Sequence, residues 1–314
     1  MINIYKTTSE TNLTLNKIDN IEAGCWVNVV APAEEEIILL AKKTGVPLEF
    51  LKAPLDDEET SRIDMIDNNI LVIVDIPFTE VEDNSLTYDT YPLAIIHTEK
   101  EIITVCLKNS KILSDFAKGD IRGFFTFKRS RFILQILNKI ANYYLLYLRQ
   151  IDKKSLMIEK KLHKSMKNKE LIQMLSLEKS LVYFSTSLKS NEITLEKMMK
   201  MPIMQKYPED NDVLEDVIIE NKQAIEMAGI YSDILAGTMD AFASIIANNL
   251  NIVMKVLAAV TIVMAIPNMI SGLFGMNVSG IPLAESSLGF TLVVGIIVSL
   301  CIAAIIILKK KDMF

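Results

Sequence analysis

The sequence has few of the residues on which enzymes and metal clusters usually depend. Its 314 residues include only three cysteines and two histidines. The cysteines, Cys25, Cys106 and Cys301, lie far apart and form no C-x-x-C pair, which predicts buried thiols in a reducing compartment and not disulfides or metal ligands. The chain also lacks a Gly-x-x-x-x-Gly-Lys loop and any evident pair of nucleophile and base. We therefore predict no enzymatic activity, no catalytic residue and no organic cofactor.

Charge is missing from one long stretch of a chain that is otherwise well charged. Charged residues make up 23% of the sequence, yet residues 256–284 contain none. A membrane-spanning helix needs about 20 mostly apolar residues, and residues 252–274 and 290–308 supply two such lengths. Joined by a short loop, they predict an antiparallel hairpin across a lipid bilayer, because each backbone must satisfy its own hydrogen bonds in lipid. The alternative is a buried helical hairpin in a soluble protein.

Basic residues are absent from the predicted loop at 275–289 but flank both spans. Lys255 stands at the start of the first span, and three lysines at 309–311 follow the second. The positive-inside rule then places the loop outside and both termini in the cytoplasm of a cell that carries this protein in its plasma or inner membrane. The first 20 residues contain no apolar run, so no signal peptide is predicted.

The first span carries polar and small residues at alternating intervals of three and four, which is the heptad period that keeps one helix face turned toward a partner or an axis. This set, called the seam below, consists of Asn251, Met254, Ala258, Thr261, Ala265, Asn268, Gly272 and Gly275. A dry helix–helix interface fits the period, since small residues allow close approach. Several copies around a water-filled pore fit it too. Asn251 and Asn268 favour the pore, because a carboxamide that faces lipid lacks a partner.

Two segments, Asn251-Ile-Val-Met-Lys-Val-Leu257 and Gly272-Leu-Phe-Gly-Met-Asn277, are followed by a short loop, a second span and a basic tail. This arrangement resembles the CorA family of magnesium channels, whose signature is Gly-Met-Asn at the outer end of the penultimate helix. The resemblance implies a homopentamer that admits Mg²⁺, with Co²⁺ and Ni²⁺ as further ions. It also implies that intracellular Mg²⁺, bound between cytosolic domains, regulates the channel.

The ion suggests which residues meet it. Mg²⁺ gives up its six waters reluctantly and prefers oxygen ligands, so a pore for the hydrated ion needs neutral oxygens. We expect these at Gly275, Met276 and Asn277, with the glycine permitting a backbone turn that exposes carbonyls. Met254 and Leu257 lie near the cytoplasmic end, where they either close the pore by dewetting or pack between helices.

Carboxylates upstream of the span suggest how cations are gathered and sensed. Asp233 and Asp240 fall on the seam extended backwards, so in a symmetric assembly each forms a ring that concentrates cations. The alternative is that they pair with neighbouring cations or face solvent. By resemblance, Asp216 matches a stalk carboxylate that binds a regulatory divalent ion between subunits, and Asp89 is the suggested partner acid from the neighbouring α/β domain.

The chain divides into five predicted parts. Residues 1–130 form a cytosolic α/β domain with αβα layers and a mostly antiparallel sheet, since β-rich runs occur at 26–30, 70–76, 93–97 and 102–107. A helix opens at Pro32, with the proline in its first turn. Residues 131–208 form antiparallel helices, and 209–274 form a stalk helix that continues into the pore-lining span. The outer loop at 275–289 precedes the second span and basic tail at 290–314.

Two alternative functions stay open. No nucleic acid is predicted as a partner under any of these functions. The outer loop lacks the aromatic and acidic character common in CorA loops, so a zinc-preferring relative is one. The absence of a His or Cys cluster in the sequence favours Mg²⁺ over Zn²⁺. The other is a membrane-anchored scaffold that transports nothing. An anchor needs neither the polar seam nor the Gly-Met-Asn end.

Overall fold

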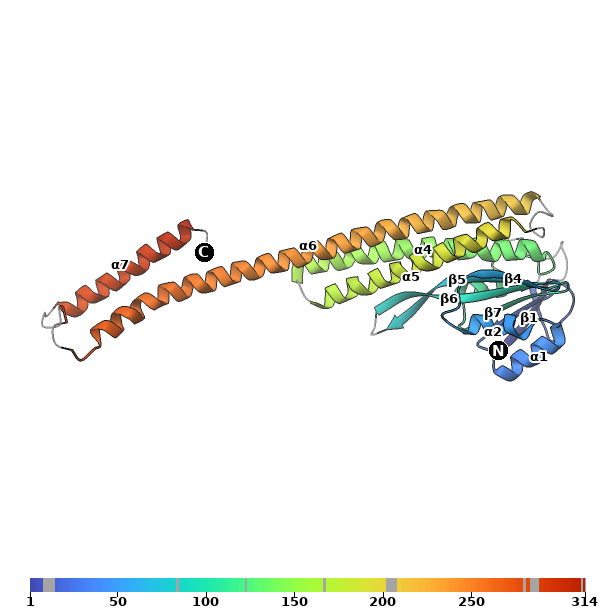
Figure 1. The fold of residues 1–314 in the computed structure, drawn as a ribbon, viewed down its shortest axis with the longest axis horizontal. Coiled ribbons are helices and arrows are strands. Elements are labelled where there is room, and N and C mark those ends of the chain that lie inside the picture. Colours follow the sequence, from blue (N-terminus) through green and yellow to red (C-terminus); the bar gives the residue numbers. More distant parts are fainter. Residues whose placement is uncertain are drawn as a thin grey trace. The chain divides into compact units, whose positions relative to one another are not determined.

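A computed structural model describes residues 1–7, 15–82, 85–121, 123–165, 168–201, 208–278, 281–282, 288–311 and 313. The chain forms two compact units, Met1–Thr238 and Met239–Phe314. The first holds the sheet and most of the helices (Figure 1), and the second holds an apolar hairpin.

The first unit is built on a seven-stranded sheet with the strand order β2-β1-β3-β7-β6-β5-β4. Only β3 and β7 pair in parallel, so the prediction of a mostly antiparallel sheet is confirmed. The strands are β1 (Ile2–Thr7), β2 (Leu15–Ile18), β3 (Trp26–Val30), β4 (Arg62–Ile66), β5 (Asn69–Glu82), β6 (Ser85–His97) and β7 (Ile102–Cys106). All four predicted β-rich runs are strands, but β1, β2 and β4 were not predicted.

Strands β5 and β6 extend well beyond the predicted runs, past two prolines. Pro92 lies opposite Asp75, and Pro77 lies opposite Thr90. A proline cannot donate to the ladder and is tolerated where its nitrogen points away from the neighbouring strand. The Asp75 backbone groups therefore also point away from β6. They meet the Asn191 side chain, whose Oδ1 accepts from the Asp75 N–H and whose Nδ2 donates to the Asp75 carbonyl, both at 2.8 Å.

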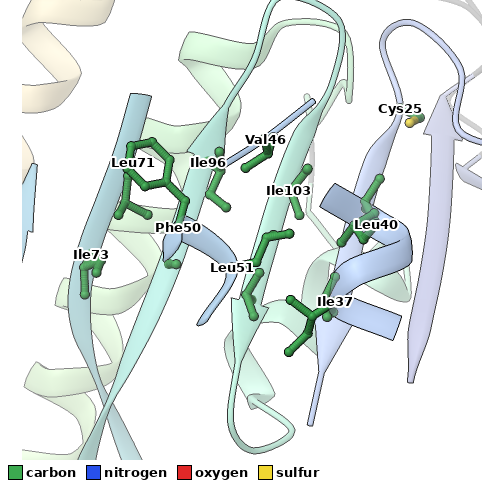
Figure 2. Packing of buried hydrophobic residues seen from close by; sticks show 14 residues of the cluster. Cys25, Ile37, Leu40, Val46, Phe50, Leu51, Leu71, Ile73, Ile96 and Ile103 are labelled. Atoms are coloured by element: carbon green, nitrogen blue, oxygen red, sulfur yellow. The ribbon is translucent and has the colours of Figure 1, made fainter. Parts of the chain in front are cut away.

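Helices cover both faces of the sheet, as the predicted αβα layers require. On one face, α1 (Glu34–Thr44) and α2 (Leu48–Lys52) bring Ile37, Leu40 and Phe50 into one buried cluster with strand residues. In Figure 2, Phe50 lies on the side of Ile73 and Ile96, and Ile37 and Leu40 lie on the side of Ile103. Helix α1 begins later than predicted. Its N-cap is Ala33 in an extended conformation, so Pro32 precedes the helix and is not in its first turn.

The other face holds an aromatic cluster and the long helices. The ring of Trp26 packs edge-on against Phe116, Phe124 and Phe132, which come from α3 (Lys111–Ala117), the segment after it and α4 (Arg129–Ser165). Helix α5 (Asn168–Met199) also contacts β4, β5 and β6. A short 3₁₀ helix, Ala53–Leu55, follows α2.

The first part of α6 (Pro208–Phe274) lies alongside α4 and α5 (Figure 1). Arg131 of α4 forms an ion pair with Asp210 at 3.1 Å, and Asn221 Nδ2 donates to the Leu188 carbonyl of α5 at 3.0 Å. The apolar residues of α6 that these helices bury recur at heptad-like intervals: Leu214, Val217, Ala224, Ala228 and Leu235. The predicted break near Pro202 lies outside the described residues.

The second unit consists of the rest of α6 and α7 (Gly289–Lys310), both long and apolar enough to cross a membrane. The first predicted span ends where α6 ends, at Phe274, and the second falls within α7. From residue 251 on, the least exposed residues are Ala259, Val263, Ala265, Ile266, Pro267 and Ile270 on α6 and Gly289, Val293, Ile297, Cys301, Ala304 and Leu308 on α7. Most of them lie on the faces by which the two helices meet. The Cys301 Sγ lies 3.9 Å from the Val263 carbonyl oxygen, which joins these faces directly.

Candidate ion pathway

The seam lies on the side of α6 that α7 leaves uncovered. At 100° per residue, seam positions such as Ala258 and Asn268 are roughly half a turn away from Val263 and Ile270, which face α7. Most of the seam is exposed in the single chain: Asn251, Met254, Leu257 beside it, Ala258, Thr261, Asn268 and Gly272 are open, and Ala265 is partly buried. The hairpin thus pairs one face of α6 internally and leaves the amide-bearing face without a cover.

Some polar side chains of the seam form hydrogen bonds within their own chain, and others do not. The Thr261 hydroxyl donates to the Leu257 carbonyl, one helical turn earlier, at 2.8 Å. Within the described residues, no hydrogen bond to the side chain of Asn251 or Asn268 is recorded. Each carboxamide brings two donors and an acceptor, so these two positions require water or another chain.

The Gly-Met-Asn segment follows the last residue of α6. The Gly275 N–H donates to the Ser271 carbonyl at 2.9 Å, and a Cβ at Gly275 would lie only 3.0 Å from that oxygen. Gly275 lies in a turn, but its φ is not in the left-handed range. The close approach to the Ser271 carbonyl disfavours a side chain here, and the role of this turn in exposing carbonyls to an ion stays a prediction.

Met276 and Asn277 extend beyond the helix end, and both are exposed. Residues 279–280 and 283–287 of the predicted outer loop lie outside the described residues.

The two acids predicted to gather cations are both exposed on α6. Asp233 belongs to the first compact unit and Asp240 to the second. No ion pair with either carboxylate is recorded among the residues that the structure describes. Their side chains are exposed to solvent. This agrees with both interpretations, a ring of carboxylates that concentrates cations and acids that only face solvent.

Asp216 is exposed on α6, and a second acid stands one turn later. The pKa of Glu220 is raised, chiefly by burial and then by the negative charge of Asp216. Asn142 of α4 donates to Glu220 Oε2 at 3.0 Å. Like charges one turn apart on a helix destabilise each other, so a cation beside Asp216 would relieve this repulsion.

Asp89 lies on β6, partly buried, within a cluster of charges. Burial raises the pKa of its carboxyl, the Thr90 N–H donates to it at 2.8 Å, and the charges of Glu80 and Lys108 oppose each other nearby. The Lys108 ammonium is held by an ion pair with Glu80 and by the ring of Tyr91 at 4.2 Å. Among the described residues of one chain, no group of three or more His, Cys, Asp or Glu that could hold a metal ion is found.

Sequence reasoning missed Asp75, the acid with the most distinctive surroundings. Burial raises its pKa to about 6, against the opposing hydrogen bonds of Ser187 and Ser61. The Tyr144 hydroxyl donates to its carbonyl at 3.0 Å, so α4 joins the contact that Asn191 of α5 makes. One signal was available, because Asp75 is the single charged residue of the apolar run at 70–76.

Comparisons with known proteins cover nearly the whole chain. A family model described as "CorA-like Mg2+ transporter protein" matches residues 22–310. The cobalt/magnesium transport protein CorA of Methanocaldococcus jannaschii is 27% identical over 326 residues, which cover 99% of each chain. The cobalt/magnesium transport protein CorA of Thermotoga maritima is 20% identical over 302 residues, covering 91% of this chain and 82% of that one. The solved complete structure of the CorA magnesium transporter from Methanocaldococcus jannaschii matches with a TM-score of 0.82 and 26% identity, covering 98% of this chain and 96% of that one.

Proposed function

The chain belongs to the CorA family of Mg²⁺ transporters, and from that premise we propose that it is a homopentameric channel for passive influx of hydrated Mg²⁺, with Co²⁺ as a second ion. The spans lie in the plasma or inner membrane with both termini in the cytoplasm. The names of the relatives support the class of ion, and the hairpin supports the membrane location.

The observation that carries this proposal is the uncovered seam of α6. A single hairpin exposes Asn251 and Asn268 on a face that α7 does not reach. In lipid this face would leave two carboxamides unsatisfied, at a cost of roughly 1–3 kcal/mol for each lost partner. Several copies around an axis remove that cost, because the seams then face one another across water.

The chemistry of the seam suits an ion that keeps its hydration shell. Neutral amide and carbonyl oxygens accept hydrogen bonds from the waters around Mg²⁺, which the ion itself surrenders reluctantly. Asn277 forms the outer ring and Asn268 the next one inward. Thr261 lines the pore with its hydroxyl bonded to its own helix, and Met254 with Leu257 form the apolar inner constriction. An inside-negative potential drives a divalent ion inward with about 4.6 kcal/mol per 100 mV, twice the single-charge value.

Gating follows from the exposed acids. Intracellular Mg²⁺ binds beside Asp216, with Asp89 of a neighbouring copy as its partner, and holds the stalks together. The repulsion that Asp216 exerts on Glu220 supports this, because it returns when the ion leaves. The rings at Asp233 and Asp240 raise the local concentration of cations at the inner mouth.

Uptake of Mg²⁺ into proteoliposomes with an inside-negative potential tests the channel. The wild-type protein takes up Mg²⁺ and N277A loses most of this uptake, because the outer ring of carboxamides is removed. The matched control is S299A, which removes an exposed polar group from the α7 face turned away from α6 and leaves uptake intact. Equal uptake by all three proteins, or none by the wild type, would contradict the proposal.

The same vesicles separate the alternatives. Competition with Co²⁺ and Zn²⁺ in the outer solution ranks the ions, and a protein that carries Zn²⁺ but not Mg²⁺ would be the zinc-preferring relative. Gating is tested by loading Mg²⁺ inside. Inner Mg²⁺ suppresses wild-type uptake and suppresses D216A uptake much less. A D216A channel that inner Mg²⁺ inhibits as strongly as it inhibits the wild type would remove Asp216 from the regulatory site.

A further inference from the structure

Pro267 lies inside α6 and interrupts the hydrogen-bond ladder of the helix at one point. A proline has no N–H, so the carbonyl four residues earlier loses its intrahelical partner. That carbonyl belongs to Val263. Within a bilayer no water replaces the lost bond, and a proline is tolerated there because a neighbouring helix supplies a substitute.

Helix α7 supplies a donor at this position. The Cys301 Sγ lies 3.9 Å from the Val263 carbonyl oxygen, and a thiol is a weak hydrogen-bond donor. Both residues are partly buried on the faces by which the two helices meet. The acceptor that the thiol reaches is thus the carbonyl that Pro267 has freed.

We propose that Cys301 is a positioning residue, whose thiol satisfies the Val263 carbonyl freed by Pro267 and so fixes the outer turns of α6 against α7. Asn268 follows Pro267 directly, and the helix ends at Phe274 just before the Gly-Met-Asn segment. The bond therefore sets the orientation of the part of the seam nearest the outer mouth. The consequence for transport rests on the proposed function, whereas the bond itself does not.

The bond makes Cys301 and Pro267 energetically dependent on each other, and a double-mutant cycle measures this dependence. C301V keeps the shape of the side chain and removes the donor. In the full-length protein in detergent it lowers the melting temperature by about 2 °C. In the P267A background the backbone N–H of residue 267 donates to the Val263 carbonyl, so this carbonyl no longer needs the thiol. C301V then leaves the melting temperature unchanged. The same loss in both backgrounds would overturn the proposal.

The thiol also reports on its own hydrogen bond. The S–H stretching band of Cys301, isolated as the infrared difference between wild type and C301V, lies at the lower frequency of a bonded thiol. In P267A this band moves to the higher frequency of a free thiol, because the acceptor has gained a backbone partner. A band at the same frequency in both proteins would show that the thiol does not bind the freed carbonyl.

Mg²⁺ uptake tests whether Cys301 positions the seam, and C301S is the conservative variant expected to restore the uptake that C301V loses. C301V lowers Mg²⁺ uptake about two- to threefold, the change expected from an average interhelical hydrogen bond in a membrane, and C301S restores it because a hydroxyl also donates. Uptake equal in wild type and C301V would remove the positioning role. A wild type without uptake would instead refute the channel, and the cycle and the infrared band would still decide whether the bond exists.

Discussion

The sheet domain and the apolar hairpin contain the same kinds of apolar side chain but bury them differently. Ile95 and Ile103 of the sheet are 0% exposed, whereas Ile296 and Ile302 of α7 are 47% and 52% exposed. The sheet domain completes its core within one chain, because helices cover both of its faces. The hairpin has one covered interface, where α6 meets α7. Its other faces must be covered by lipid or by other copies of the chain.

Polar groups show the same contrast. In the sheet domain the Trp26 Nε1 donates to the Thr104 hydroxyl at 2.8 Å, and Asn191 is satisfied by Asp75 and Ser61. In the hairpin, Asn251 and Asn268 have no such partner among the described residues. Buried polar groups are normally hydrogen-bonded, as they are in the sheet domain. Asn251 and Asn268 are exposed in the single chain, and under the proposed function they meet water and other copies of the chain.

The largest expected effect breaks the self-contained core. F132A empties a site that is 0% exposed and lies 5.3 Å, ring to ring, from Trp26. We expect a loss of about 3–5 kcal/mol in the free energy of unfolding. Chemical denaturation of the full-length protein in detergent measures it through Trp26, the single tryptophan. The matched variant is F290A in the hairpin, where the side chain is 83% exposed, and less than about 0.5 kcal/mol is expected from it. Equal losses would contradict the contrast.

The next effect concerns two partly buried titratable groups of the sheet domain, Asp75 and His97, that respond to pH in opposite directions. The pKa of Asp75 is raised from 3.8 to about 6 by burial, so the folded state favours its protonated form. Its contribution to stability is complete below pH 3.8 and is lost as the pH rises through about 6. The pKa of His97 is lowered from 6.5 to about 4, first by burial and then by Arg129. Its contribution is complete above pH 6.5 and is lost as the pH falls through about 4.

Each of these shifts corresponds to about 3 kcal/mol, so the two largely cancel in the wild type between pH 4 and 6.5. A variant that lacks one of the two groups shows the pH dependence of the other. In D75N the free energy of unfolding rises with pH across this interval, and in H97Q it falls. Denaturation curves at several pH values, followed through Trp26, measure both slopes. Parallel curves for the two variants would mean that these groups do not carry the shifts assigned to them.

The sequence predicted the hairpin well because hydropathy and charge are local properties. The ends of both spans and the continuity of α6 followed from runs of apolar residues and from helical spacing. The sheet was harder. Strands β1 and β2 were missed because they mix polar residues with few apolar ones, and β5 and β6 were predicted too short because Pro77 and Pro92 resemble strand ends. A strand tolerates each of these prolines only where the proline nitrogen points away from the neighbouring strand. That direction is known only once the strand pairing is known.

In the candidate ion pathway, too, some features followed from the sequence and others did not. The seam follows from the period and residue types of the sequence, and its role as a pore lining stays a prediction. The structure adds that α7 covers the opposite face of α6. The contact between Cys301 and Val263 was not predictable, since it depends on the depth at which two helices meet after a loop. Asp75 stood out in an apolar run, but its partner Asn191 lies 116 residues away. The close approach of Gly275 to the Ser271 carbonyl was not predicted, because it depends on the backbone geometry at the helix end.

The smallest expected effect separates polar groups that the chain satisfies from those that it does not. T261V removes a hydroxyl that donates to the Leu257 carbonyl. That carbonyl also accepts the Thr261 N–H in the helix, so nothing is left unsatisfied, and we expect a change of less than about 0.5 kcal/mol in stability. Mg²⁺ uptake stays within about twofold of wild type for the same reason. N268A is the contrasting variant, because its carboxamide depends on water or other copies, and its uptake falls further. If T261V lost as much uptake as N268A, the Thr261 hydroxyl would have to meet the ion's waters itself, and satisfaction within the chain would no longer distinguish the two positions.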